Sequence, residues 1–476
     1  MIKKFIKYYR KHWKLFMLDI SCAFFMALAD LVYPYITRQM IDDYIPSRNL
    51  SMIIKVAIFL FLVFILRYIL QYIVNYWGHV VGVRMETDMR EELFSHLQKL
   101  SFKFYDNNKV GYLMSRIVND LNNLSELAHH GPEDLFISSI TILGAFIIML
   151  NMNWVLTIFT FIMLPIMIFF SIKLGHRMHQ NFRDIREKIA EVNSQIEDSL
   201  SGIRVVKSFT NEDYEQEKFN CGNNRFRESR ETAYHTMAQF VSGIHFFSNM
   251  IELITIAVGA YLIYQTWLTI GELVAFLFYV NMFMRPVRRL VSLNEQYQRG
   301  MAGFSRFQEL LSVKPEINEK RNKKELKGVE GNIKYSDVSF GYDNDSKVLE
   351  HINLYIKKGE TVAFVGPSGA GKTTICNLLP RFYEIEKGAL LIDGIDIRDV
   401  SLSSLRKNIG IVQQDVFLFN GSIRDNISYG RPGAEDREIV EAAKKANAHN
   451  FIVNLKNGYD TEIGERGVKL SGGQKQ

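Results

Sequence analysis

Long apolar stretches dominate the first 290 residues of this 476-residue chain. A helix that spans a membrane needs about 20 predominantly apolar residues. Six stretches meet this requirement, near residues 15–38, 54–78, 134–152, 154–174, 246–266 and 268–290. Buried helices of a soluble domain are the alternative, but six such segments in this length of chain favour membrane spans. The pattern therefore predicts an α-helical membrane domain with six spans.

Two long polar stretches follow the second and the fourth of these segments. Apolar residues recur within them at helical spacing, which predicts that the spans continue as amphipathic helices beyond the membrane. The helical pattern breaks once in each stretch, at residues 105–111 and 208–213. An ordinary helix–turn–helix connection and a short helix that lies across a second domain and transmits its movement explain these breaks equally well.

Basic residues indicate the side of the membrane on which each loop lies. Six of them precede the first span, with no acidic residue among them: Lys3, Lys4, Lys7, Arg10, Lys11 and Lys14. The two long loops also contain many Lys and Arg residues, and such residues are enriched in the cytoplasmic loops of membrane proteins. We therefore expect both termini in the cytoplasm. This asymmetry also accounts for the net charge of +6 without a nucleic-acid partner.

Three ionisable residues, Asp30, Arg67 and Glu252, fall within the predicted spans. Such residues are costly in a membrane and are functional-site candidates by default. They either line a cavity for amphipathic or cationic cargo, or they pair with each other or lie beyond the lipid on extended helices. The second interpretation is favoured for Arg67, and the two are equally supported for Asp30 and Glu252.

The pattern changes beyond the polar, charged stretch 312–330, which we interpret as a linker. Strand-like segments begin at Ile333, and short β-favouring stretches then alternate with helical ones, as in a soluble α/β domain. One of them, Thr361–Val365, leads into a glycine-rich loop and then into a helical stretch. The order strand, loop and helix is the context that a phosphate-binding loop requires.

The loop fits G-x-x-x-x-G-K-[ST], whose backbone amides wrap phosphate oxygens. It consists of Gly366, Pro367, Ser368, Gly369, Ala370, Gly371, Lys372, Thr373 and Thr374. Lys372 is expected to contact the β- and γ-phosphates of a nucleotide, and Thr373 to offer its hydroxyl to Mg²⁺. The glycines allow the backbone to approach the phosphates closely. The chain therefore binds a nucleoside triphosphate, ATP or GTP.

A second motif near the end of the sequence narrows the choice among families of nucleotide-binding proteins. It consists of Leu470, Ser471, Gly472, Gly473 and Gln474. Ser471 can cap a helix, and the two glycines leave backbone amides free to meet a phosphate. Together the two motifs resemble those of the ATP-binding-cassette (ABC) family. The whole chain is similar to a half-size bacterial exporter of the multidrug and lipid-flippase type.

This resemblance implies a fold and a division of the chain. We expect an α-helical transmembrane domain of six spans with long cytoplasmic extensions at 1–311, a linker at 312–330 and an α/β P-loop ATP-binding domain at 331–476. It also implies an integral protein of the bacterial inner membrane that uses ATP and Mg²⁺ to export or flip amphipathic small molecules, drugs or lipids. Which molecule it exports is not readable from the sequence.

The resemblance also assigns roles to single residues. Tyr342 matches the aromatic residue that stacks on adenine, with a core tyrosine at a strand end as the alternative. Gln414 matches the glutamine that reaches Mg²⁺ and the attacking water, with Gln413 as the competing register. Thr373 is the second implied Mg²⁺ ligand. Glu465 matches the acidic residue of a loop that touches the cytoplasmic helices, with a solvated turn as the alternative.

In the ABC family the Ser471–Gln474 motif serves the ATP held by the opposite protomer. A half-size transporter must therefore dimerise. Both half-sites match the family pattern, which favours a homodimer, although a heterodimer stays open. Membrane lipid and an amphipathic cargo are the other implied partners.

The family pattern continues with an apolar strand that ends in Asp-Glu, and then a His, and none of these occurs within the 476 residues. We therefore expect the ATP-binding domain of the chain as written to be incomplete, to bind ATP poorly and not to hydrolyse it. An incomplete reading frame explains this. The alternative is a truncated, non-hydrolytic nucleotide-binding membrane protein that modulates an intact partner, and a membrane-anchored GTPase is a further rival.

Overall fold

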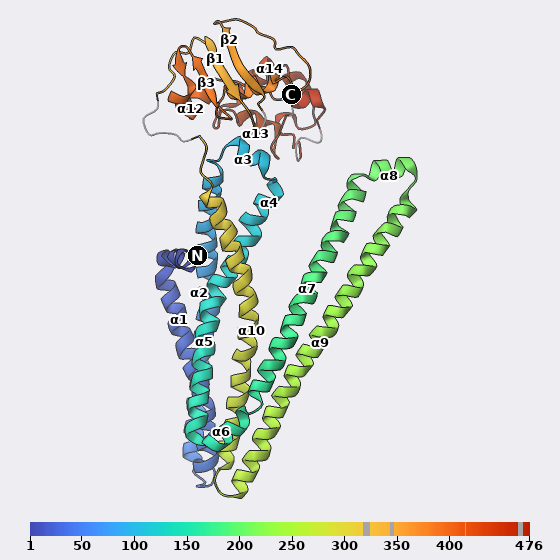
Figure 1. Ribbon diagram of the computed structural model, residues 1–476. Helices are drawn as coiled ribbons and strands as arrows, with labels where there is room; N and C mark the ends of the chain where they lie inside the picture. Colours follow the sequence, from blue (N-terminus) through green and yellow to red (C-terminus); the bar gives the residue numbers. More distant parts are fainter. Residues whose placement is uncertain (318–323, 343–346, 415, 465–469) are drawn as a thin grey trace. The chain divides into compact units, whose positions relative to one another are not determined.

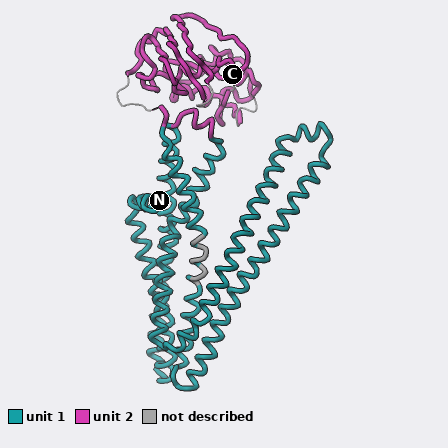
Figure 2. Tube along the Cα trace, in the orientation of Figure 1, with its two compact units in different colours: residues 1–99, 108–314 teal, residues 100–107, 315–476 magenta. Residues whose placement is uncertain are grey.

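The computed structural model describes residues 1–317, 324–342, 347–414, 416–464 and 470–476, and within 285–294 it describes the side chains of Pro286, Arg289 and Leu293. The chain forms two compact units (Figure 2). Unit 1 comprises residues 1–99 and 108–314, and unit 2 comprises residues 100–107 and 315–476. Glu465 lies outside the described residues, so the role expected for it is not tested.

Unit 1 is built from long helices (Figure 1). They are α1 (Ile2–Gln39), α2 (Leu50–Leu97), α5 (Leu121–Met152), α7 (Leu164–Ser201), α9 (Glu212–Tyr264) and α10 (Ile270–Ser312). Shorter helical segments join them, namely η1 (Met40–Tyr44), α4 (Val110–Ser115), η2 (Arg116–Asp120), α6 (Trp154–Phe161) and α8 (Ile203–Phe209). Helix α10 packs on α1, α5 and α9, and α7 runs beside α9.

Five of the described helices are long and apolar enough to cross a membrane. They are Ile2–Tyr44, Leu50–Leu97, Val110–Met152, Trp154–Ser201 and Glu212–Tyr264. Helix α10 contributes a shorter apolar stretch, Ile270–Met284. The expectation of membrane-spanning helices is thus confirmed for five helices, while the sixth span stays a prediction.

A helix ends within each of the two stretches, 105–111 and 208–213, where the sequence predicts a break. Helix α3 (Phe102–Asn107), which follows α2 and precedes α4 along the chain, ends in the first stretch, and α8 ends at Phe209 in the second. Thr210 follows α8 with a φ of 56°, a left-handed conformation that terminates a helix. The residues of α3 belong to unit 2, whereas those of α8 belong to unit 1.

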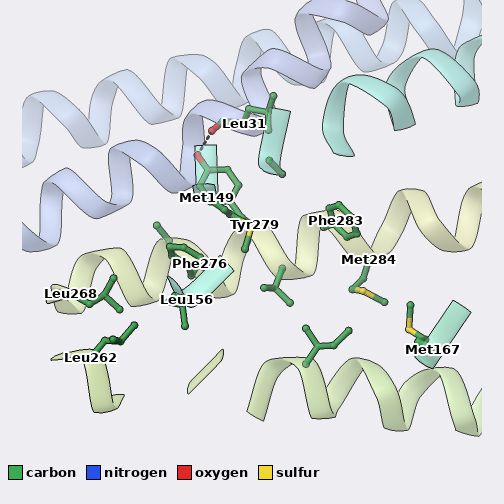
Figure 3. Packing of buried hydrophobic residues seen from close by; sticks show 14 residues of the cluster. Leu31, Met149, Leu156, Met167, Leu262, Leu268, Phe276, Tyr279, Phe283 and Met284 are labelled. Carbon is green, nitrogen blue, oxygen red and sulfur yellow. Dashed lines mark hydrogen bonds between the residues drawn. The ribbon is translucent and has the colours of Figure 1, made fainter. Parts of the chain in front are cut away.

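The apolar core of unit 1 gathers around α10 (Figure 3). Phe276 and Tyr279 are completely buried there against residues of α1, α5, α6 and α9. The hydroxyl of Tyr279 donates a hydrogen bond of 2.8 Å to the backbone carbonyl of Leu31, drawn as a dashed line in Figure 3. A buried hydroxyl needs such a partner because the membrane interior offers no water to replace it.

Polar contacts hold both ends of α10. At its start, the carboxylate of Asp42 accepts a hydrogen bond of 2.8 Å from the backbone N–H of Gly271, where a Cβ atom would lie 2.6 Å from that carboxylate. Near its other end, Asp120 accepts hydrogen bonds of 2.8 and 2.7 Å from Arg306 and one of 2.9 Å from Arg116. Asp120 is 5% exposed, while Arg116 and Arg306 are partly exposed, so the two arginines compensate a buried carboxylate from its solvent side.

Arg67 and Asp30 form an ion pair between α2 and α1. The Nη2 of Arg67 donates to Asp30 at 3.3 Å, and the Nη1 donates to Gln71 at 3.0 Å. The pairing favoured for Arg67 is therefore confirmed, and it also accounts for Asp30.

Unit 2 contains a four-stranded antiparallel sheet in the order β2-β1-β3-β4. The strands are β1 (Ile333–Phe340), β2 (Leu349–Ile356), β3 (Lys387–Ile392) and β4 (Ile395–Asp396). The central strand β1 begins at Ile333, as the sequence predicts. Its residue Tyr335 pairs with Leu354 on one side and Leu390 on the other.

Helices complete unit 2. They are α3, α11 (Lys372–Leu378), α12 (Leu402–Lys407), α13 (Ile423–Ser428), α14 (Asp436–Lys445), α15 (His449–Val453) and α16 (Gly472–Lys475), with 3₁₀ turns η3 (Ile397–Asp399) and η4 (Gly458–Asp460). One apolar cluster joins the sheet to α11 and α12 through Phe340, Leu378 and Leu405. A second cluster joins α13, α14 and α15 through Ile423, Ala443 and Ile452.

The carboxylate of Asp393 fastens the segment before β1 to the turn between β3 and β4. It accepts hydrogen bonds from the backbone N–H groups of Glu330, Gly331 and Asn332, the first and last at 2.8 Å. Burial alone would raise the pKa of Asp393, but these backbone hydrogen bonds outweigh it and lower the pKa. A carboxylate with a lowered pKa stabilises the fold above its unfolded-state pKa, and this contribution is lost as pH falls through the folded-state pKa.

We therefore expect Asp393→Asn to loosen this segment at neutral pH. A neutral amide accepts backbone hydrogen bonds more weakly, so the amides of residues 330–332 should exchange with deuterium about tenfold faster. In the unchanged protein the same protection should persist at neutral pH and decline below about pH 4. Amides of α14 in the same samples are the internal control. Equal exchange at 330–332 in both proteins would contradict the role of Asp393.

Candidate nucleotide-binding site

The predicted strand before the glycine-rich loop is not formed among the described residues. Thr361–Val365 has no regular secondary structure and belongs to no sheet, and Val365 is 92% exposed. The apolar segment around Val412 behaves in the same way, with Val412 77% exposed. The expectation of a strand at 361–365 is therefore wrong for this structure. The physical reason is that a strand needs a neighbour for its N–H and C=O groups, and no described segment pairs with these residues.

The glycine-rich loop and the helix that follows it, α11, are formed as predicted. Gly371 caps the start of α11 with a φ of 82°, a conformation that favours glycine. A Cβ atom at Gly371 would also lie 2.6 Å from Cδ2 of Leu349. The loop therefore excludes a side chain at this position for two independent reasons.

Lys372 lies across the loop. Its Nζ donates hydrogen bonds of 2.9 Å to the carbonyl oxygen of Gly366 and 2.7 Å to that of Pro367. These two carbonyls hold the ammonium group at the centre of the loop, where an anion is expected to bind. Phosphate oxygens are stronger acceptors than neutral carbonyls, so Lys372 can exchange these partners for the phosphates of a nucleotide.

Thr373 and Thr374 follow with different surroundings. Thr373 is exposed at the start of α11, and its hydroxyl is the kind of oxygen ligand that Mg²⁺ prefers. Thr374 is 5% exposed, and its hydroxyl lies 3.1 Å from the hydroxyl of Tyr342. Thr374 therefore links the loop to the sheet rather than to solvent.

Tyr342 is half-buried beside the loop. Its ring contacts Phe340 and Tyr383 edge to face, with ring centroids 5.0 and 5.1 Å away. This environment holds the ring in place next to α11 through the contact with Thr374. It agrees with a packed tyrosine at the end of β1, and it also places the ring near the loop that would bind the phosphates.

The remaining predicted residues lie apart from the loop. Gln414 is exposed in a bend, and no described contact joins it to the residues of the loop. Ser471 caps α16, as the sequence predicts, because its hydroxyl accepts from the N–H of Gln474 at 3.4 Å. The side chain of Gln474 accepts in return from the N–H of Ser471 at 3.0 Å. Gly472 and Gly473, the first residues of α16, have no atom within 4 Å of an added Cβ.

A contact that the sequence did not predict connects this site to α3 within unit 2. The hydroxyl of Tyr383 donates to the carboxylate of Asp106 at 2.8 Å. The ring of Phe102 lies 4.3 Å from that of Phe382. Burial and the hydrogen bond to Asp106 both raise the pKa of Tyr383, so its hydroxyl stays protonated and donates. Thr374, Tyr342, Tyr383 and Asp106 thus form a continuous series of contacts from α11 to α3, which we name the tyrosine relay.

Comparison with models of known families identifies two regions of the chain. The ABC transporter transmembrane region matches residues 16–287, and the ABC transporter model matches residues 349–476. The second match contains both the glycine-rich loop and the motif at 470–474.

Similar proteins cover the full chain. The uncharacterized ABC transporter ATP-binding protein YwjA of Bacillus subtilis is 48% identical over 100% of this chain and 83% of its own length. An ATP-dependent lipid A-core flippase of Syntrophus aciditrophicus is 35% identical over 100% of this chain and 79% of its own length. A solved bacterial Atm1-family ABC exporter with ATP bound superimposes with a TM-score of 0.78 at 27% identity, covering 97% of this chain and 82% of that one.

Proposed function

The chain belongs to the ABC transporter family and is an ATP-driven exporter, and we propose that it moves amphipathic drugs or lipids across a bacterial inner membrane as a dimer. The observation that carries the proposal is the loop closed around Lys372, in the same chain as five helices able to cross a membrane. A similar protein named as a lipid A-core flippase supports a lipid or lipid-like cargo. This evidence favours export over the alternative of a non-hydrolytic modulator.

We propose a role for each part of the chain. Residues 1–311 form the transmembrane domain with α10 as the sixth span, 312–330 the linker, and 331–476 the ATP-binding domain. The apolar stretch Ile270–Met284 of α10, buried at the centre of the core of unit 1, supports the sixth span. Both termini are proposed to be cytoplasmic, since the basic residues before α1 favour that side.

The residues of the loop fit a nucleoside triphosphate. The nucleotide site comprises Tyr342 for the adenine ring, the loop Gly366–Thr374 for the phosphates and, from the opposite protomer, Ser471–Gln474. Mg²⁺, held by Thr373 and Gln414, would neutralise charge on the phosphates. Tyr342 and Thr374 already stand beside each other at the start of this site.

The movement of the two ATP-binding cassettes follows from the difference in ATP affinity between the closed and the open dimer. ATP can close two cassettes only if it binds the closed dimer better than the open one. In the proposed cycle Lys372 leaves the carbonyls of Gly366 and Pro367 for the phosphates, and Ser471 of the opposite protomer completes the site. The tyrosine relay and α3 then carry the closure to the membrane helices.

Hydrolysis of ATP is proposed to reset the dimer. A residue that orients the attacking water is needed for turnover. Gln414 is proposed for this role, because it matches the glutamine that reaches Mg²⁺ and the attacking water in the family.

Reconstituted vesicles test this function. The protein in proteoliposomes should move a short-chain fluorescent phospholipid or an amphipathic dye when ATP and Mg²⁺ are supplied. Movement is followed by quenching of the fluorophores that remain on the accessible side. GTP should support much slower movement than ATP, because the chain belongs to an ATP-binding family.

Vesicles without ATP and vesicles containing the Lys372→Ala variant are the controls. Both should show background movement alone. The proposal fails if neither the phospholipid nor the dye moves in response to ATP, or if GTP serves as well as ATP.

A further inference from the structure

Three buried ionisable side chains meet inside unit 1, away from the nucleotide site. Asp19 comes from α1, and His129 and Glu133 lie one turn apart on α5. They are 2%, 5% and 7% exposed, respectively. One ligand atom from each lies within 4.8 Å of the ligand atoms of the other two.

None of these atoms has a hydrogen-bond partner among the described residues. The unpartnered atoms are Oδ1 of Asp19, Nδ1 of His129 and Oε2 of Glu133. Leaving a buried polar atom unpaired is costly, and leaving a buried charge uncompensated is more so. A cluster of three such atoms therefore calls for a bound group that satisfies all of them at once.

We propose that Asp19, His129 and Glu133 bind a divalent transition-metal ion, for which Zn²⁺ is the probe. Nδ1 of His129 lies 3.5 Å from Oε2 of Glu133, which is long for a hydrogen bond. Ligand atoms about 2.0–2.2 Å from a tetrahedral Zn²⁺ are themselves separated by about 3.3 Å. The observed spacing therefore suits two ligands of one ion, and a divalent cation balances the charge of the two carboxylates.

The surroundings favour an ion with affinity for nitrogen. The ring centroids of His79 and His130 lie 4.3 and 4.4 Å from that of His129. Nδ1 of His79 lies 2.6 Å from the carbonyl oxygen of Asn75. In the tautomer whose Nδ1–H donates to this carbonyl, Nε2 is left as an acceptor, a common arrangement for a metal-binding histidine. Ligand atoms of His79, His129 and His130 also lie within 4.8 Å of one another, so His79 can supply a further ligand from α2 to an ion bound by His129.

A glycine on α2 makes this arrangement possible. A Cβ atom at Gly78 would lie 2.0 Å from Cε1 of His129 and 3.2 Å from Oδ1 of Asp19. The absence of a side chain at Gly78 therefore lets His129 occupy its position. The combined nitrogen and oxygen ligands favour Zn²⁺ and related ions over Mg²⁺ and Ca²⁺, which prefer oxygen ligands throughout.

Metal binding is measured directly, without any transport assay. The complete protein in lipid nanodiscs is stripped with a chelator, and Zn²⁺ is titrated in competition with a coloured chelator of known affinity. We expect one Zn²⁺ per protomer. Glu133→Gln and Asp19→Asn, which keep the size of each side chain but remove its charge, should each weaken binding by at least about tenfold.

Glu126→Gln is the matched control, because it makes the same change on α5 at a half-exposed position. Its affinity should stay within about twofold of the unchanged protein. X-ray absorption at the zinc edge should show nitrogen and oxygen ligands that include imidazole. Equal affinities for Glu133→Gln and Glu126→Gln, no stoichiometric Zn²⁺, or a shell without imidazole would overturn the proposal. If Glu133→Gln is not recovered folded, the Zn²⁺ affinity of Asp19→Asn is compared with that of Glu126→Gln instead, and equal affinities would again overturn the proposal.

Discussion

Replacing Lys372 with alanine should abolish ATP binding and, with it, export. In the structure its ammonium group donates to the carbonyls of Gly366 and Pro367, so it already lies where phosphates are expected. Hydrogen bonds to charged groups contribute about 1.5–3 kcal/mol each, so losing two such bonds from Lys372 to phosphate oxygens would cost at least about 3 kcal/mol. That corresponds to at least about a 100-fold loss of affinity. Titration with a fluorescent ATP analogue measures it.

Lys347→Ala provides the comparison for this result. Lys347 is an exposed lysine of unit 2 that lies 3.8 Å from Glu350 and makes no described contact with the loop. Its loss should leave the affinity for ATP within about twofold. Retention of ATP binding by Lys372→Ala, to the same extent as by Lys347→Ala, would show that the loop does not bind the phosphates.

Replacing Tyr383 with phenylalanine should uncouple export from ATP hydrolysis, so that export slows while the nucleotide site stays intact. The change keeps the ring that packs on Tyr342 but removes the hydroxyl that donates to Asp106 of α3. A hydrogen bond to a carboxylate contributes about 1.5–3 kcal/mol, so its loss should slow export about tenfold or more. ATP affinity should be nearly unchanged, because Lys372 and the loop glycines remain. The rate of ATP hydrolysis and the rate of export are measured in the same reconstituted vesicles.

The control and the pairing test use two further variants. Tyr355→Phe removes the hydroxyl of a tyrosine on β2 that is 55% exposed, and it should have no effect on export. Asp106→Asn should resemble Tyr383→Phe, and the double variant should be no worse than either single one, since both remove the same interaction. Additive effects of the two changes would mean that the hydrogen bond between them is not what couples α3 to the site.

Local sequence rules predicted the parts of the molecule that depend on near neighbours. Five of the six span-length apolar stretches, the glycine-rich loop with the helix after it, and the cap of Ser471 on α16 are confirmed. Each depends on composition or on residues a few positions apart. Pairing, which the sequence favours for Arg67, is confirmed, whereas the sequence leaves Asp30 equally open to a role in a cargo cavity.

Features that depend on distant residues could not be predicted in this way. Thr361–Val365 has the composition of a strand, but a strand exists only beside a partner, and composition does not report one. Tyr383 and Asp106, which contact each other, are separated in the sequence by most of the membrane helices. Asp19 and His129 are likewise far apart in sequence, and nothing in either neighbourhood indicates that α1 and α5 bring them together.

The number of cargo molecules moved for each ATP hydrolysed tests the central claim most directly. Phospholipid or dye movement and phosphate release are recorded together in vesicles that contain the protein. An ATP-driven exporter should give a constant ratio as ATP is varied, with both rates lost in Lys372→Ala. Cargo movement that continues unchanged without ATP, or hydrolysis that proceeds with no cargo movement for either compound, would contradict the account.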